Sequence, residues 1–202
     1  MLRFLNLCLM CVFFFPLYAE SQIKSSSTGV LFPKNSSFSQ DGKNYDLAIT
    51  GVATRKKFFV KIYSVASYLQ KEAIGSGAIL EQIMEDKWAK QLTLKWVHEA
   101  DLKRVKDGYL ESFRNSLGST QFAGLQQPID EYLSFFQQDV QKGDEHILKW
   151  LPGGNIELLI NDHFVGSIKN EAFAKALWSL WFGSKSFVNR DNLLSLTDAK
   201  EE

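Results

Sequence analysis

The sequence predicts an α+β fold built around an antiparallel sheet. Strand-like segments come first, helical stretches follow, three short strands come next, and helical stretches close the chain. The three late strands, expected over 146–151, 156–160 and 164–168, are separated by tight turns rich in glycine, asparagine and aspartate. Because turns this short join antiparallel neighbours, this order of elements favours α+β over a parallel α/β sheet.

The longest strand-like region is Leu47–Leu69, which is rich in β-branched and aromatic residues. The basic group Arg55-Lys56-Lys57 interrupts this region, so we expect two antiparallel strands with a turn over 54–57. Neither alternating face of the second strand is plainly polar, and we therefore expect both of its faces to be covered.

Caps and apolar spacing indicate the other elements. A clean alternation over 91–97 predicts a half-buried strand. Asp101 is suited to cap a helix whose apolar residues recur at helical spacing over 102–117. Asn170 is placed to cap a later helix that Gly183 ends.

The N-terminal segment resembles a targeting signal. Arg3 is followed by an apolar run and then by Ala19, a small residue suited to cleavage. The run is shorter than the roughly 20 residues that a spanning helix needs, so no stable membrane span is expected after cleavage. The protein is therefore expected to be exported, either periplasmic or secreted. The predicted organisation is a signal peptide (1–19), a flexible leader (20–28), one domain (29–197) and a frayed tail (198–202).

Composition excludes several kinds of site. The chain has 23 basic and 23 acidic side chains, which argues against nucleic acid as the main partner because phosphate binding needs a basic surplus. Both cysteines, Cys8 and Cys11, lie in the predicted signal, so the mature chain would have no thiol. The three histidines lie in separate segments without metal-ligand spacing, and His146 and His163 are expected to be solvated. No nucleophile elbow or phosphate loop is found, and we expect neither a metal nor a cofactor.

Arg55 is the strongest candidate functional residue. It is either a solvated turn arginine beside two lysines, or it points inward and pairs with a ligand carboxylate or oxyanion. An inward guanidinium needs an anionic partner, and a carboxylate supplies bidentate, charge-assisted hydrogen bonds. Tyr63 lies eight residues further on and would provide a second donor if the turn folds the chain back. The 16 phenylalanines and five tryptophans fit either a packed aromatic core or an apolar cavity.

Two segments resemble the bacterial chalcone isomerase-like proteins. The segment GVATRKKFFVKIY, residues 51–63, with Tyr68-Leu69, resembles one signature of that family. Residues 166–168 and 173–183 resemble its C-terminal pattern. The resemblance implies an open-faced β-sandwich, in which a large antiparallel sheet is covered by a layer of helices with a ligand cleft between them. Plant members of this superfamily close a flavanone ring, whereas related plastid proteins bind fatty acids through an arginine and a tyrosine.

The resemblance also assigns roles position by position. Arg55 matches the shared arginine, and Tyr63 falls where the enzymes have a threonine, which is similar to the fatty-acid binders. Asp101 and Gly108 fall where the enzymes have a tyrosine and an asparagine, and neither residue is able to play the same role. An aspartate would repel an anionic substrate, and glycine has no side chain. The isomerase constellation is therefore mostly missing.

Three functions follow, of which the first is favoured. The first is an exported, non-catalytic binder of a fatty acid or similar amphipathic carboxylate, held by Arg55 and Tyr63. The second is an intramolecular lyase on a phenolic substrate, in which Arg55 would be the catalytic group that stabilises an oxyanion. The third is a structural or partner-binding module whose cleft is filled by its own phenylalanine and tryptophan side chains.

Overall fold

A seven-stranded antiparallel sheet forms the centre of the molecule, and each strand pairs with the next one along the chain. This computed structural model describes residues 21–196, so the predicted signal peptide and frayed tail lie outside the described residues. The α+β prediction is confirmed, and the three late strands form the expected meander. In sheet order the strands are β3 (Asn35–Gln40), β4 (Lys43–Lys57), β5 (Val60–Gln70), β6 (Lys90–Trp96), β7 (Glu145–Leu151), β8 (Asn155–Ile160) and β9 (His163–Lys169).

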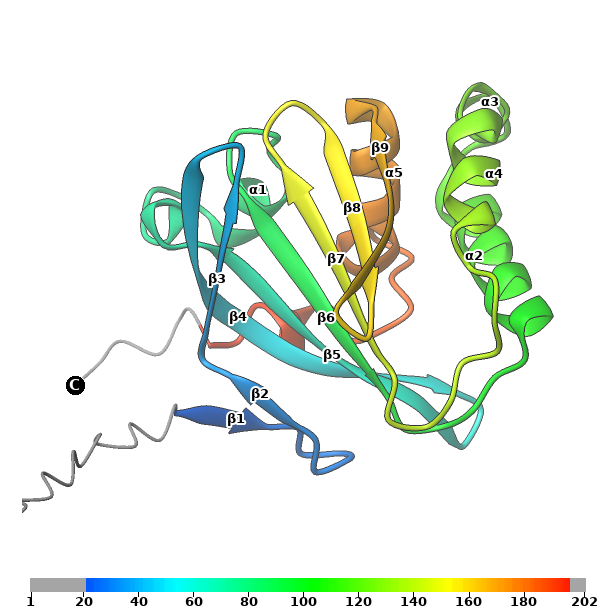
Figure 1. Cartoon of the computed structure of the whole chain (residues 1–202), viewed down its shortest axis with the longest axis horizontal. Coiled ribbons are helices and arrows are strands. Elements are labelled where there is room, and N and C mark those ends of the chain that lie inside the picture. Colours follow the sequence, from blue (N-terminus) through cyan, green and yellow to red (C-terminus); the bar gives the residue numbers. More distant parts are fainter. Residues whose placement is uncertain (1–20, 197–202) are drawn as a thin grey trace, which may run out of the picture.

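Helices cover one face of this sheet, which gives the open-faced arrangement (Figure 1). Helix α5 lies against β8, α2 packs on α5, and α4 packs on β9. Two cap predictions are confirmed: the Asp101 side chain accepts a hydrogen bond from the Arg104 N–H at 2.8 Å, and Asn170 accepts one from the Phe173 N–H at 2.9 Å. The α-helices are α1 (Ile79–Met84), α2 (Leu102–Ser116), α3 (Ser119–Gly124), α4 (Gln126–Ser134) and α5 (Glu171–Phe182), and the 3-10 helices are η1 (Lys71–Ala73) and η2 (Asp191–Leu193). Among the described residues, no helix is both long and apolar enough to cross a bilayer.

Strand β5 is buried on both faces, as the sequence predicted. Tyr63 and Val65 belong to the main core between sheet and helices, whereas Ala66 and Tyr68 belong to a second cluster with Phe32. Strand β6 is also buried along nearly all of its length, so the half-buried strand expected over 91–97 is wrong. Helices cover one face of β6. On its opposite face the Gln91 and Thr93 side chains are hydrogen-bonded to each other and buried.

The flexible leader predicted over 20–28 is wrong for its described part. Residues Gln22–Lys24 form β1, which pairs with β2 (Leu31–Pro33) beside the main sheet (Figure 1). The Ser25 hydroxyl is buried and lies 3.1 Å from the Ser64 hydroxyl of β5. The serine-rich composition suggested a mobile segment. In the structure, the Ser25 and Thr28 hydroxyls lie within hydrogen-bond distance of the Ser64 hydroxyl on β5.

The turn predicted over 54–57 lies further along the chain. Strand β4 continues to Lys57, which pairs with Val60, so Phe58 and Phe59 form the two-residue turn. The register shifts between the Arg55 and Lys56 pairs, leaving Ile62 as the extra residue of a β-bulge. Basic side chains at the end of a strand reach water as easily as those in a turn, so the charge pattern did not distinguish the two. Arg55 lies within β4 and pairs with Tyr63 of β5.

Candidate functional site

The candidate site is built around Arg55 and Tyr63, which are direct partners in the β4–β5 ladder. The Arg55 guanidinium carbon lies 4.1 Å from the centre of the Phe187 ring and 6.0 Å from the centre of the Tyr63 ring. Among residues 21–196, no carboxylate forms an ion pair with Arg55. This half-buried cation is flanked by aromatic faces and lacks an anionic partner. The inward orientation proposed for Arg55 is therefore the one that the structure has.

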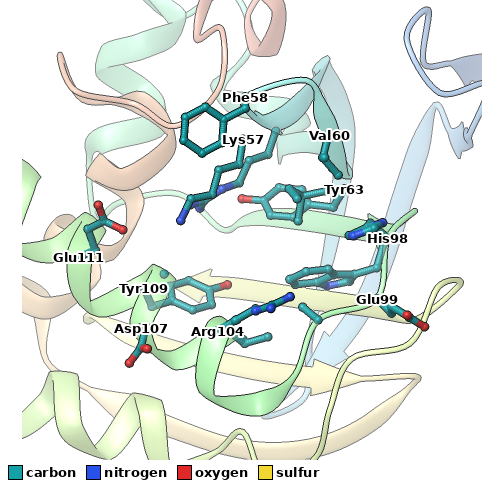
Figure 2. A pocket seen from close by; sticks show the side chains of 16 residues that line it. Lys57, Phe58, Val60, Tyr63, His98, Glu99, Arg104, Asp107, Tyr109 and Glu111 are labelled. Carbon is teal, nitrogen blue, oxygen red and sulfur yellow. The ribbon is translucent and has the colours of Figure 1, made fainter.

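A cavity of about 570 Å³ opens beside Arg55, between the end of the β4–β5 hairpin and helix α2. Figure 2 shows side chains from both elements facing this space. The sheet supplies Ile62, Tyr63 and Trp96, and α2 supplies Val105, Gly108 and Tyr109. An open cavity at Arg55 argues against a module whose cleft is filled by its own aromatic side chains.

Three buried hydrogen-bond donors close to Arg55 and Tyr63 have no partner among residues 21–196. They are the Tyr63 hydroxyl and the indole nitrogens of Trp96 and Trp181. Burial raises the pKa of the Tyr63 phenol above its ordinary value of 10.0, and the nearby Arg55 and Trp181 offset this effect only in part. Buried polar groups are nearly always hydrogen-bonded, so these donors indicate where an acceptor belongs. A neutral phenol, an indole N–H and a guanidinium together suit an anionic oxygen.

The two positions that depart from the enzyme pattern have different locations. A Cβ on Gly108 would lie 4.0 Å from Nη2 of Arg55, so the missing side chain leaves free space directly beside the guanidinium. Asp101 caps α2, forms an ion pair with Arg104 at 3.1 Å, and does not line the cavity. The repulsion of an anionic ligand that the sequence suggested at Asp101 therefore does not arise inside the site.

Tyr109 is a site residue that the sequence analysis assigned only to the apolar side of its helix. Its hydroxyl points into the cavity, toward the space that the Tyr63 hydroxyl also faces (Figure 2). Burial raises the pKa of Tyr109 above its ordinary value, so this phenol is also neutral. Helical spacing does not distinguish a packed tyrosine from one whose polar tip reaches a cavity, which is why this residue was missed.

A second cavity, of about 610 Å³, lies between the chain following α4 and strands β7 to β9. His146 borders it and is fully buried, so the prediction of a solvated histidine is wrong. The His146 ring packs between Trp96 and Phe136, with centroid distances of 5.4 Å and 5.8 Å, and neither ring nitrogen has a hydrogen-bond partner. Burial lowers the pKa of His146 to about 4, although Asp144 acts in the opposite direction. Trp96 borders the first cavity, so this aromatic row separates the two spaces.

A seven-stranded antiparallel sheet, helices on one of its faces and a cavity between sheet and helices define an open-faced sandwich. The sequence profile of the chalcone isomerase-like family matches residues 25–193, and the chain belongs to this family. A fatty-acid binding protein from Arabidopsis thaliana has a similar fold, with a TM-score of 0.71 and 18% sequence identity. The similarity covers 88% of this chain and 97% of the plant protein. Among curated proteins, none matches this sequence.

Proposed function

We propose that this protein binds a fatty acid or a similar amphipathic carboxylate, without chemical conversion, in the cavity beside Arg55. The observation that carries the proposal concerns the described residues, 21–196: among them the half-buried Arg55 has no ion-pair partner and the adjacent Tyr63 hydroxyl has no hydrogen-bond partner. A guanidinium and a carboxylate form two parallel charge-assisted hydrogen bonds, and the phenol adds a further donor. The carboxylate would therefore satisfy groups that the protein leaves unpaired.

The remaining walls suit an apolar chain. Ile62, Trp96 and Val105 line the cavity between its polar groups, and its volume falls in the range typical of small-molecule sites. One solved structure with a similar fold is that of a fatty-acid binding protein, which supports the same ligand class for this chain. An amphipathic carboxylate matches Arg55, Tyr63 and the apolar part of this lining, while Glu99, Asp107 and Glu111 line the same cavity and would have to lie away from the carboxylate.

The same groups give less support to an intramolecular lyase. Arg55 and Tyr63 would stabilise a phenolate oxyanion as readily as a carboxylate. However, Gly108 provides no side chain, Asp101 does not line the cavity, and the raised pKa of Tyr63 disfavours this phenol as a base. The lyase is tested by following the absorbance of a panel of chalcones with and without the protein. A rate above the spontaneous cyclisation would overturn the non-catalytic assignment.

The binding proposal is tested on protein purified without delipidation. We expect native mass spectrometry to show a bound fatty acid, and delipidated protein to bind a fluorescent fatty acid with saturation. Arg55→Gln should weaken this binding by at least about tenfold, because it removes a charge-assisted pair. The matched control is Arg114→Gln, an exposed arginine that stacks on Phe122 outside the cavity. A wild type that neither carries nor binds fatty acid, or an Arg55→Gln variant with wild-type affinity, would refute the proposal.

Export is a separate part of the proposal. The support is the N-terminal sequence, in which an apolar run follows Arg3 and precedes Ala19. Expression in a secreting bacterial host should yield a protein whose intact mass lacks residues 1–19. Full-length protein retained in the cytoplasm would contradict export without affecting the cavity assignment.

A further inference from the structure

The tip of the β4–β5 hairpin displays two adjacent phenylalanines to solvent. Phe58 is 88% exposed and Phe59 is 100% exposed, while the following Val60 is 44% exposed. Figure 1 shows this hairpin extending beyond the end of the other strands. Isolated exposed apolar residues are ordinary, but two adjacent and almost fully exposed aromatic rings at the end of a projecting hairpin mark an interaction surface.

The backbone at this tip is not optimised for stability. Phe58 has a φ of 55°, in the left-handed region where bulky side chains are disfavoured. Two-residue hairpin turns usually place glycine, asparagine or aspartate at such a position. A strained aromatic residue that buries almost nothing in the protein contributes little to the stability of the fold.

The charged side chains within the hairpin tip itself are all positive. Residues 55–61 contain Arg55, Lys56, Lys57 and Lys61, and no acidic residue. Lys56 and Lys57 are exposed, and no carboxylate among residues 21–196 forms an ion pair with either of them. Lys61 is also exposed, and its ammonium donates a hydrogen bond to the Ser27 carbonyl. Exposed aromatic rings surrounded by lysines complement an anionic bilayer, in which the rings enter the interface and the ammonium groups reach the phosphates.

We propose that the hairpin tip, residues 56–61, docks on the surface of an anionic phospholipid bilayer. Lys57, Phe58 and Val60 also line the cavity beside Arg55, so docking would bring the cavity mouth to the membrane. Glu99, Asp107 and Glu111 line the α2 side of that mouth. Their negative charge opposes close contact of α2 with anionic lipid, so the tip alone engages the bilayer. The docking surface is defined by its own exposure and charge and does not rest on the proposed fatty-acid ligand.

The test is sedimentation of the protein without residues 1–19, whose apolar run would itself bind lipid, with sucrose-loaded vesicles that contain no free fatty acid. We expect binding to vesicles of phosphatidylcholine with about one third phosphatidylglycerol, and little binding to phosphatidylcholine alone or in high salt. Phe59→Ser should weaken vesicle binding by about tenfold, since it removes one inserted ring. Lys56→Gln with Lys57→Gln should weaken it by about fivefold for each removed charge.

Matched controls separate docking from general surface effects. Phe164→Ser removes a phenylalanine that is 60% exposed on the edge strand β9, and it should retain wild-type vesicle binding. Lys34→Gln with Lys43→Gln removes two exposed lysines outside the tip and should do the same. Circular dichroism checks that every variant is folded, and the lysine pair provides a second test if Phe59→Ser is not.

Three outcomes would overturn the docking proposal. The first is a wild type that does not sediment with the anionic vesicles. The second is tip variants that bind vesicles as the wild type does. The third is a tip that instead mediates a stoichiometric protein complex while vesicle binding is absent. A negative vesicle result would not bear on the Arg55 site, because soluble fatty acid is measured in a separate titration.

Discussion

Arg55 and Tyr63 are directly paired across the β4–β5 ladder, with the guanidinium carbon 6.0 Å from the centre of the tyrosine ring. A β-bulge follows this pair toward the tip, and the pair lies where α2 approaches the sheet. The arginine lacks a carboxylate among the described residues, and the tyrosine hydroxyl lacks any hydrogen-bond partner. An unpaired cation beside an unpaired donor lowers stability in the empty protein, and both groups gain a partner when an anion binds.

Tyr63→Phe should move stability and affinity in opposite directions. The substitution removes a buried, unpaired hydroxyl and keeps the ring, so the ligand-free protein should gain about 1 kcal/mol in free energy of unfolding. Fatty-acid affinity should fall by about tenfold, because one charge-assisted hydrogen bond is lost. Thermal unfolding of delipidated protein and titration with a fluorescent fatty acid measure the two effects. A ligand-free variant less stable than wild type would show that the hydroxyl already has a structural role.

Gly108 should control access to Arg55. It lies in the interior of α2, where glycine costs about 1 kcal/mol relative to alanine. A Cβ there would make ordinary contact with Arg55, at 4.0 Å from Nη2. Gly108→Ala should therefore raise the free energy of unfolding by about 0.5–1 kcal/mol and keep ligand binding. Gly108→Leu should fill the space beside the guanidinium and weaken fatty-acid binding strongly.

The pair of Gly108 variants provides its own control. Both replace the flexible glycine, so a change common to both reports on the helix, and a difference between them reports on the cavity. Denaturant unfolding and the fatty-acid titration are measured for each. Equal fatty-acid affinity of the alanine and leucine variants would show that the ligand does not occupy the space beside Arg55.

The fold was predictable because local signals agreed with each other. The tight turns after 151 and 160, the cap at Asp101 and the cap at Asn170 are all short-range features, and each one was confirmed. The position of the β4–β5 turn was not predictable in the same way. The turn was expected over 54–57, at the basic group, and the actual turn consists of Phe58 and Phe59, which no turn preference would select.

The site was predictable only in part, because short-range sequence features do not show which side chains meet in space. Arg55 and Tyr63 were proposed from the charge pattern and from the resemblance, which also aligned Gly108 with a position of the enzymes' site. Tyr109 was assigned only to the apolar side of its helix, because apolar spacing on a helix does not show which side chain meets a cavity. Burial of His146 was missed because a single polar residue at the start of a strand carries no signal about the loop that covers it.

Phe58→Asn should stabilise the protein although it removes a large apolar side chain. Phe58 is 88% exposed and holds a φ of 55°, a conformation that asparagine tolerates much better. We expect the free energy of unfolding to rise by roughly 0.5–1 kcal/mol, because strain is relieved and almost no burial is lost. Urea denaturation provides the measurement, and Phe59→Asn is the matched control, since Phe59 does not have a positive φ. Equal effects of the two substitutions would contradict strain at Phe58.

His146 should make stability depend on pH in the mildly acidic range. Burial lowers the pKa of this imidazole from 6.5 to about 4 in the folded protein. Between these two values the unfolded chain binds a proton that the folded chain does not. The free energy of unfolding should therefore be constant above about pH 6.5 and fall as the pH drops toward 4, by about 3 kcal/mol in all.

His146→Phe should remove this acid-dependent loss. Phenylalanine keeps the ring packing against Trp96 and Phe136, carries no titratable group, and leaves no unpaired nitrogen. The adjacent cavity of about 610 Å³ gives the slightly larger ring room. Denaturant unfolding at a series of pH values from 7.5 to about 4 compares the variant with wild type and with His163→Gln, an exposed histidine that should leave the slope unchanged. If the slope persists in His146→Phe, the acid sensitivity arises from other groups, and His146 is not the residue that sets it.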